Sequence, residues 1–237
     1  MFRDRVDAGQ QLGARLKEFA GQEFAQDEAV LVLALPRGGV PVGFEVAAAL
    51  HAPLDVFVVR KLGAPGHEEL AMGAIASGGV RVTNDEVLRA MRVTPMQMEE
   101  TAAKELQELE RREQEYRGDR APLAVKGRTI VLVDDGLATG YTMRAAVAAL
   151  RQMSPKRIVI AVPVAARSTC EELESEADAV LCLYTPFEFV AVGQWYGNFA
   201  QTSDDEVREL LERAASRAET GHETSCEGRG EDRRRER

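Results

Sequence analysis

The feature that most constrains this chain is an apolar run that ends abruptly in two adjacent carboxylates. Residues 131–142 have the sequence VLVDDGLATGYT. The apolar part is too short for a helix and is typical of a strand that is buried on both faces. After it, apolar residues recur at helical spacing, at Met143, Ala146, Val147 and Leu150. The sequence therefore predicts a strand, a turn rich in glycine and threonine, and then a helix.

Such a turn has the chemistry to bind a phosphorylated ribose. Backbone N–H groups at a helix N-terminus favour a phosphate. Asp134 and Asp135, next to that turn, suit sugar hydroxyls or a hydrated Mg²⁺. The alternative interpretation is an ordinary strand–turn–helix connection in which the two carboxylates only cap the helix.

A second loop, Leu35-Pro36-Arg37-Gly38-Gly39, follows an earlier apolar strand. On these two motifs the chain resembles the type I phosphoribosyltransferases. The stretch from Ile130 to Thr142 matches the family's signature for 5-phosphoribosyl 1-diphosphate (PRPP), and the Pro36–Gly39 loop matches its pyrophosphate-binding loop. The resemblance extends more weakly from Phe2 to about Leu211.

The resemblance implies an α/β fold with a Rossmann-like parallel sheet, flanked by helices and carrying a small hood. Strands alternating with helices also predict a parallel sheet with right-handed crossovers. We expect residues 1–215 to form the phosphoribosyltransferase domain, ending in an amphipathic helix over 204–215. Residues 216–237 have few apolar side chains and predict a disordered, charged tail.

The function implied by the resemblance is transfer of the 5-phosphoribosyl group of PRPP to an acceptor, commonly a nitrogen base, with release of pyrophosphate. Asp134 and Asp135 would hold the ribose hydroxyls directly or through Mg²⁺, the expected cofactor. The residues expected to bind the 5′-phosphate are Ala138, Thr139, Gly140, Tyr141 and Thr142. The alternative is a non-catalytic regulatory protein that binds PRPP or a nucleotide on the same fold.

The resemblance also indicates which residues bind the pyrophosphate. Its expected partners are Pro36, Arg37, Gly38, Gly39, Arg60 and Lys61, and the expected catalytic residues are Asp134, Asp135, Arg37 and Lys61. In the family the first loop often contains a cis peptide, here Pro36–Arg37. Residues 60–73 contain several helix and strand breakers and resemble the family's flexible catalytic loop, with His67, Glu68 and Glu69 closing over the site. The alternative is a surface loop with incidental charges.

Two further positions bear on the acceptor. In the 6-oxopurine enzymes of the family, the residue before the Thr-Gly of the signature is an aspartate, whereas here it is Ala138. Hypoxanthine and guanine are therefore disfavoured. The base-binding hood would fall in the aromatic stretch 186–196, although aromatic residues at this density are also typical of a core.

The composition argues against several other classes of function. A net charge of −9 argues against general nucleic-acid binding, and no stretch has the length and apolarity of a membrane span. Cys170, Cys182 and Cys226 fit neither a disulfide framework nor a zinc site, and a reducing cytoplasm is the simplest location. We expect small-molecule partners, no nucleic acid, no membrane, and a homodimer as one option.

Overall fold

The computed structural model describes residues 1–23, 29–122 and 124–227. Its central element is a five-stranded sheet with strand order β2-β1-β6-β7-β8, in which every neighbouring pair is parallel. The strands are β1 (Val30–Ala34), β2 (Leu54–Val56), β6 (Thr129–Val133), β7 (Arg157–Val164) and β8 (Ala179–Tyr184). The prediction of an α/β fold with a parallel sheet is confirmed.

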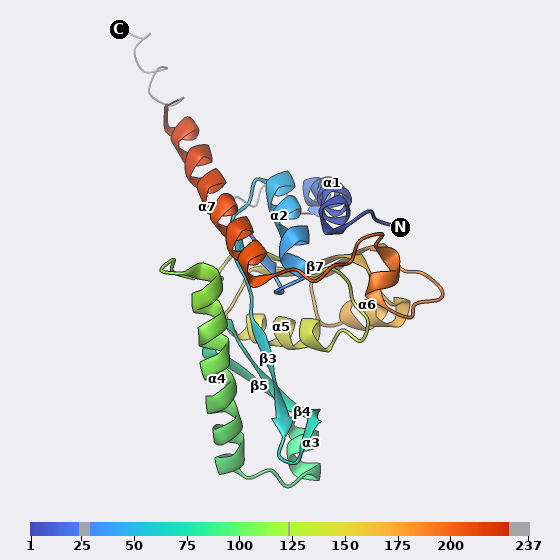
Figure 1. Cartoon of the computed structure of the whole chain (residues 1–237), viewed down its shortest axis with the longest axis vertical. Coiled ribbons are helices and arrows are strands. Elements are labelled where there is room, and N and C mark those ends of the chain that lie inside the picture. Colours follow the sequence, from blue (N-terminus) through green and yellow to red (C-terminus); the bar gives the residue numbers. More distant parts are fainter. Residues whose placement is uncertain (24–28, 123, 228–237) are drawn as a thin grey trace.

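Helices cover both faces of this sheet (Figure 1). In β6, Val131 and Val133 pack in one core cluster, and Ile130 and Leu132 pack in the other. This alternation follows from the two-residue period of a strand. The first face carries α1 (Arg5–Glu23), α2 (Gly39–Leu50) and α7 (Asp204–Glu227), and the opposite face carries α5 (Tyr141–Gln152) and α6 (Arg167–Leu173).

A smaller antiparallel sheet, of order β3-β4-β5, projects from the main body together with two helices (Figure 1). Its elements are β3 (Val59–Ala64), β4 (His67–Ala76), η1 (Ser77–Gly79), β5 (Val80–Thr83), α3 (Asp85–Ala90) and α4 (Pro95–Arg117). The expectation that no regular element spans residues 60–73 was wrong. These residues form a hairpin, because shifts of register on either side of Gly63 let an irregular sequence stay paired.

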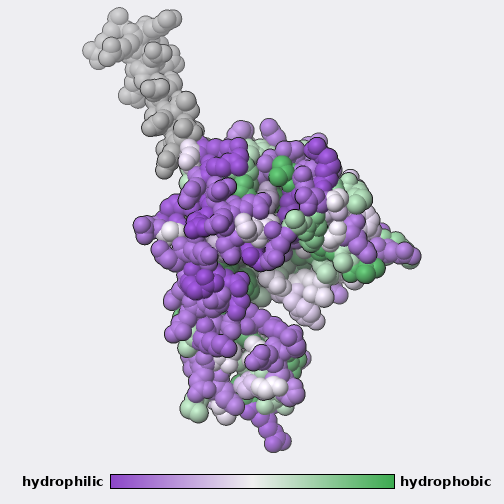
Figure 2. All heavy atoms as spheres, viewed as in Figure 1, coloured by the Kyte–Doolittle hydropathy of each residue, from purple (hydrophilic) through white to green (hydrophobic). Residues whose placement is uncertain are grey.

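The helix α4 begins as the sequence predicts. The hydroxyl of Thr94 accepts a hydrogen bond from the backbone N–H of Gln97, whose side chain accepts one from the N–H of Thr94. Only a narrow stripe of α4, including Leu109 and Tyr116, is buried. The face of the molecule drawn in Figure 2 is mainly hydrophilic over this part of the structure, as expected for a helix that lies largely in solvent.

The segment between β8 and α7 forms the hood and contains η2 (Val192–Trp195). It is tied to the N-terminus of the chain. The N–H of Phe2 donates to the carbonyl of Trp195 at 2.8 Å, the N–H of Gly197 donates to the carbonyl of Phe2 at 2.8 Å, and the rings of Phe2 and Tyr196 lie 5.4 Å apart. The hood is therefore held in place by the first residues of the chain.

One sequence-based expectation needs correction at the C-terminal side. The last helix does not end at Ala215, because α7 continues to Glu227; extending an existing helix requires no new nucleation. Its buried contacts, Val207 and Leu211, are as expected. Residues 228–237, where we also expected disorder, lie outside the described residues.

The cysteines differ from expectation as well. Cys170 of α6 and Cys182 of β8 form a disulfide. The sequence could not reveal this pair, because which face of α6 meets β8 is decided by tertiary packing. Within the described part of the chain, no helix combines the length and apolarity needed to cross a membrane.

Candidate active site

The two glycine-containing loops meet at one edge of the main sheet. β1 and β6 are parallel neighbours, with Ala34 paired to Val133, so the loops that follow them begin side by side. The N–H of Leu35 continues this pairing by donating to the carbonyl of Val133 at 2.9 Å. In an open parallel sheet, this carboxyl edge is where ligands bind.

Glycine is required where the first loop contacts the acidic pair. A Cβ at Gly38 would lie 2.0 Å from Oδ2 of Asp135, and one at Gly39 would lie 2.9 Å from the carbonyl oxygen of Val133. The Pro36–Arg37 peptide is cis, as the resemblance implied. A side chain at Gly38 would therefore have to displace the carboxylate of Asp135, and one at Gly39 would overlap the backbone at the end of β6.

Asp134 and Asp135 are both partly buried. Oδ1 of Asp134 accepts a hydrogen bond from the N–H of Asp135 at 2.8 Å. Oδ2 of Asp135 accepts one from Nε of Arg5 at 2.8 Å, and its backbone carbonyl accepts one from the hydroxyl of Tyr196 at 2.6 Å. Arg5 thus holds the carboxylate of Asp135, and Tyr196 holds its backbone.

Burial, followed by repulsion from Asp135, raises the pKa of Asp134 well above its usual range. Burial also raises the pKa of Asp135, whereas the guanidinium of Arg5 opposes that rise. The free site consequently disfavours two negative charges. A cation or a set of hydroxyl donors placed beside the pair would remove that penalty.

The turn after the acidic pair exposes its backbone. Gly140 has a φ of 70°, in the left-handed region that favours glycine, and immediately precedes α5. Ala138, Thr139, Tyr141 and Thr142 are exposed. Because the first N–H groups of a helix have no partner within it, the start of α5 presents donors at this turn. Donors and dipole together suit a phosphate.

Arg37 extends from the first loop toward the start of α7. Its Nη1 lies 3.5 Å from Oδ2 of Asp204, and Oδ1 of Asp204 accepts a hydrogen bond from the hydroxyl of Tyr116 at 2.8 Å. The side chain of Arg37 remains one-third exposed. This cation therefore stands beside the loop with a weak ion pair that an anionic ligand can displace.

The residues predicted to form the catalytic loop have ion-pair partners on α4 and within the hairpin. Nη2 of Arg60 lies 2.6 Å from Glu105 of α4, and Nζ of Lys61 lies 3.3 Å from Glu69 on the neighbouring strand. This part of the hairpin and α4 together line a cavity of about 380 Å³. His67 and Glu68 are exposed at its far end.

Residues 3–196 match the family model described as the phosphoribosyl transferase domain. The chain belongs to the phosphoribosyl transferase domain family. Two proteins from two strains of Mycobacterium tuberculosis, both carrying the name "putative phosphoribosyl transferase", are 50% identical to it over 214 residues. The match covers 90% of this chain and 47% of each relative, so the chain spans about half the length of these curated relatives.

Among solved structures, the crystal structure of TT1426 from Thermus thermophilus resembles this phosphoribosyl transferase domain with a TM-score of 0.78. Its sequence is 43% identical, and the match covers 89% of this chain and 97% of TT1426.

Sequence reasoning missed three residues that contact the signature of this phosphoribosyl transferase domain. Arg5 and Tyr196 hold Asp135, and Thr169 donates to the carbonyl of Ala138 at 2.6 Å. The last two belong to no motif. For Arg5, the one sequence feature that could have indicated a role was the cluster of charged residues at the start of the chain.

The hood differs in part from the predicted base-binding surface. Tyr196 is only 4% exposed and packs between Phe2 and Phe199, so it belongs to the core. Phe187, by contrast, is 97% exposed. An aromatic face is therefore available in the hood at Phe187 but not at Tyr196.

The acidic pair has the donor chemistry for Mg²⁺. That ion is commonly held by one or two carboxylates together with substrate oxygens and water, not by a complete protein cage. Such a site needs no cluster of three or more His, Cys, Asp or Glu side chains. Residues 1–23, 29–122 and 124–227 contain none. When bound, Mg²⁺ would supply positive charge beside Asp134 and Asp135.

Proposed function

We propose that this domain is a Mg²⁺-dependent phosphoribosyltransferase. It would transfer the 5-phosphoribosyl group of PRPP to an acceptor, most simply a nitrogen base, and release pyrophosphate. The proposal is carried by one observation: the Pro36–Gly39 loop packs directly against Asp135, whose Oδ2 would lie 2.0 Å from a Cβ at Gly38. This packing supports a site in which the donors for two phosphate groups lie close to the acceptors for a sugar.

The proposed roles follow from chemistry. The N–H groups around Gly140 and the start of α5 hold the 5′-phosphate, to which Thr139 adds a hydroxyl. Asp134 and Asp135 accept from the ribose hydroxyls, or hold Mg²⁺ beside them. The amides of Gly38 and Gly39 and the guanidinium of Arg37 bind the pyrophosphate, which carries the growing negative charge as it leaves.

With the ribose held at both ends, C1′ faces the acceptor. A nitrogen lone pair attacks C1′, the bond from C1′ to the pyrophosphate oxygen breaks, and the anomeric centre inverts. The protein contributes mainly by positioning and by electrostatic stabilisation of the leaving group. We further propose that Arg60 and Lys61 exchange Glu105 and Glu69 for pyrophosphate when the hairpin closes, with Lys61 acting in catalysis.

A second candidate is a regulatory protein that binds PRPP without turning it over. The observation that favours it is the engagement of Arg60 and Lys61 with α4 and β4 rather than with the two loops. Release of pyrophosphate from Mg·PRPP across a panel of nucleobases and amines separates the two. Turnover with any acceptor supports the enzyme, and tight binding without turnover supports the regulator.

Two variants test the site and act as controls for each other. Arg37→Ala should weaken pyrophosphate binding by about 10- to 150-fold and leave ribose 5-phosphate nearly unchanged, because it removes one charged hydrogen bond. Thr139→Val should show the reverse selectivity. Calorimetry with each ligand measures both. Equal losses for both ligands in both variants would refute the assignment of separate loops.

A further inference from the structure

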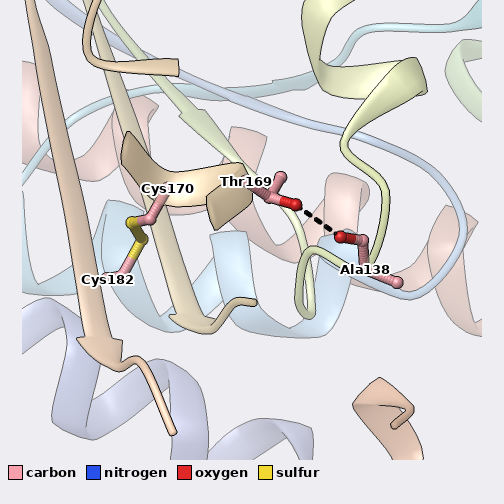
Figure 3. The surroundings of a disulfide bond; sticks show 4 residues. All are labelled: Ala138, Thr169, Cys170 and Cys182. Carbon is pink, nitrogen blue, oxygen red and sulfur yellow. Dashed lines mark hydrogen bonds between the residues drawn. A yellow bond between two sulfur atoms is a disulfide. The ribbon is translucent and has the colours of Figure 1, made fainter. Parts of the chain in front are cut away.

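The disulfide lies next to the phosphate-binding turn, although no residue of the turn is a cysteine. Cys170 belongs to α6 and Cys182 to β8, which is an edge strand of the main sheet. The residue before Cys170 is Thr169, whose hydroxyl donates to the carbonyl of Ala138 (Figure 3). Two adjacent residues of the short helix α6 therefore link it to different parts of the domain. Cys170 is bonded covalently to the sheet, and Thr169 contacts the turn.

The disulfide borders the surface of the molecule. Both cysteines line a surface cavity of about 310 Å³, together with Arg167, Glu171 and Glu174. Cys170 is 8% exposed and Cys182 is partly exposed. Thiol–disulfide exchange requires a thiolate to approach one sulfur atom, so Cys182 is the more accessible point of attack.

Several contacts transmit the position of α6 to the turn. Besides the bond from Thr169 to Ala138, the N–H of Ala166 donates to the carbonyl of Leu137 at 3.0 Å. The methyl group of Thr169 lies so close to Gly140 that a Cβ there would be 2.6 Å from it. A displacement of α6 must therefore move or release the turn.

Other contacts would keep α6 folded without the disulfide. Leu173 is completely buried, and Arg144 of α5 forms ion pairs with Glu172 and Glu176. Cys170 as a free thiol would remain a small apolar side chain in the same core. Loss of the disulfide should accordingly loosen α6 and the turn without unfolding the domain.

We propose that the Cys170–Cys182 disulfide is a redox modification site, at which a small dithiol lowers the affinity of the neighbouring turn for phosphate. The phosphate-binding part rests on the function proposed above. A thiolate of the dithiol attacks Sγ of Cys182, and Cys170 leaves as a thiolate that takes up a proton. The second thiol then attacks the mixed disulfide and frees Cys182. Two electrons and two protons pass to the protein, and the dithiol becomes a disulfide.

The first measurement needs no ligand. The native full chain is compared before and after treatment with dithiothreitol, with N-ethylmaleimide labelling to locate free thiols and amide hydrogen exchange to follow the backbone. We expect two new labelled thiols, at Cys170 and Cys182. We also expect at least threefold faster exchange over residues 137–144 and 166–173, with residues 39–50 unchanged as an internal reference.

Three variants sharpen this comparison. Cys170→Ser/Cys182→Ser should exchange like the reduced protein and no longer respond to dithiothreitol. Thr169→Val keeps the disulfide but loses the hydroxyl, so reduction should still loosen 166–173 while changing 137–144 much less. Cys226→Ser, which removes the third cysteine of the chain, should respond like the wild type.

Calorimetry then links the site to phosphate. Reduction should weaken ribose 5-phosphate about three- to tenfold and change pyrophosphate by less than twofold, because the pyrophosphate loop follows a different strand. The inference is overturned if no new thiols appear, or if they appear while exchange over 137–144 stays the same. If exchange changes but ribose 5-phosphate binds in neither state, the redox coupling stands and the proposed function fails.

Discussion

The contact between Gly140 and Thr169 allows a quantitative test of how the turn after the acidic pair is held. Gly140 has a φ of 70°, and a Cβ there would lie 2.6 Å from the methyl carbon of Thr169. Gly140→Ala therefore combines two costs: a left-handed backbone for a residue with a side chain, and overlap with Thr169. A matched control separates them. Gly127 has a φ of 73°, and no atom lies within 4 Å of the position that a Cβ would take there.

The control gives the backbone cost alone. Gly127→Ala should destabilise the protein by about 1–2 kcal/mol, the usual cost of the left-handed conformation. Gly140→Ala should cost about 2–5 kcal/mol, because overpacking adds a further 1–3 kcal/mol. For a chain of 237 residues, each kcal/mol corresponds to a fall in Tm of about 2–4 °C. The two variants should thus be clearly separated in a thermal melt.

A double-mutant cycle identifies the overlap. Thr169→Ser removes the methyl group and retains the hydroxyl that donates to Ala138. In the Thr169→Ser background, Gly140→Ala should cost no more than Gly127→Ala does, which gives a favourable coupling energy of about 1–3 kcal/mol. Urea denaturation of the four proteins measures it. A coupling energy below about 0.5 kcal/mol would refute the close packing of the turn on α6.

Three further perturbations test the site and its supports. Asp134→Asn should stabilise the metal-free protein by about 0.5–2 kcal/mol while weakening Mg·PRPP, because the amide still accepts from the N–H of Asp135 and removes both the buried charge and its repulsion from Asp135. Since folding raises the pKa of Asp134, wild-type stability falls as pH rises through the interval above its unfolded value of about 3.9. The gain in urea titrations with EDTA should therefore vanish near pH 3 and grow toward neutrality, and a pH-independent gain would contradict this cause. Arg117→Met should cost about 3–5 kcal/mol in thermal melts, because it removes the guanidinium that bonds Asp55 at 2.8 Å with both side chains under 10% exposed; an unchanged Tm would show that this buried pair contributes nothing. Arg5→Met should cost about 1.5–3 kcal/mol through loss of the charged bond to Asp135, and Arg5→Lys should cost less; equal losses would mean that packing, not charge, is what Arg5 provides.

The sequence predicted those parts of the site that depend on neighbouring residues. The strand over 129–133, the turn and α5 follow directly from periodicity and from the glycines, and both loops had to reach the same edge once the sheet was parallel. The capping box at Thr94 is equally local. The strand, the turn, α5 and the capping box each need only a short window of residues, and the tertiary contacts of the structure agree with that local preference.

The missed features depend on pairing between distant residues or on the environment. The hairpin over 59–76 contains Gly63, Pro65 and Gly66, which looked like breakers, but cross-strand bonds to β4 outweigh their local preference. The Cys170–Cys182 bond requires α6 to turn one particular face toward β8. Neither arrangement can be predicted from the conformational preferences of short segments.

Arg5 shows this limit inside the site itself. Its partner Asp135 lies 130 residues away, and the arrangement depends on the hood. The chain start pairs with the hood through Phe2, Trp195 and Gly197, which places Arg5 next to the end of β6 and stacks its guanidinium 4.0 Å from the ring centre of Phe199. The signature therefore does not position its own second carboxylate. Arg5, at the start of the chain, orients the side chain of Asp135, and Tyr196 orients its backbone. The family motif can therefore be complete in the sequence while its geometry depends on residues outside the motif.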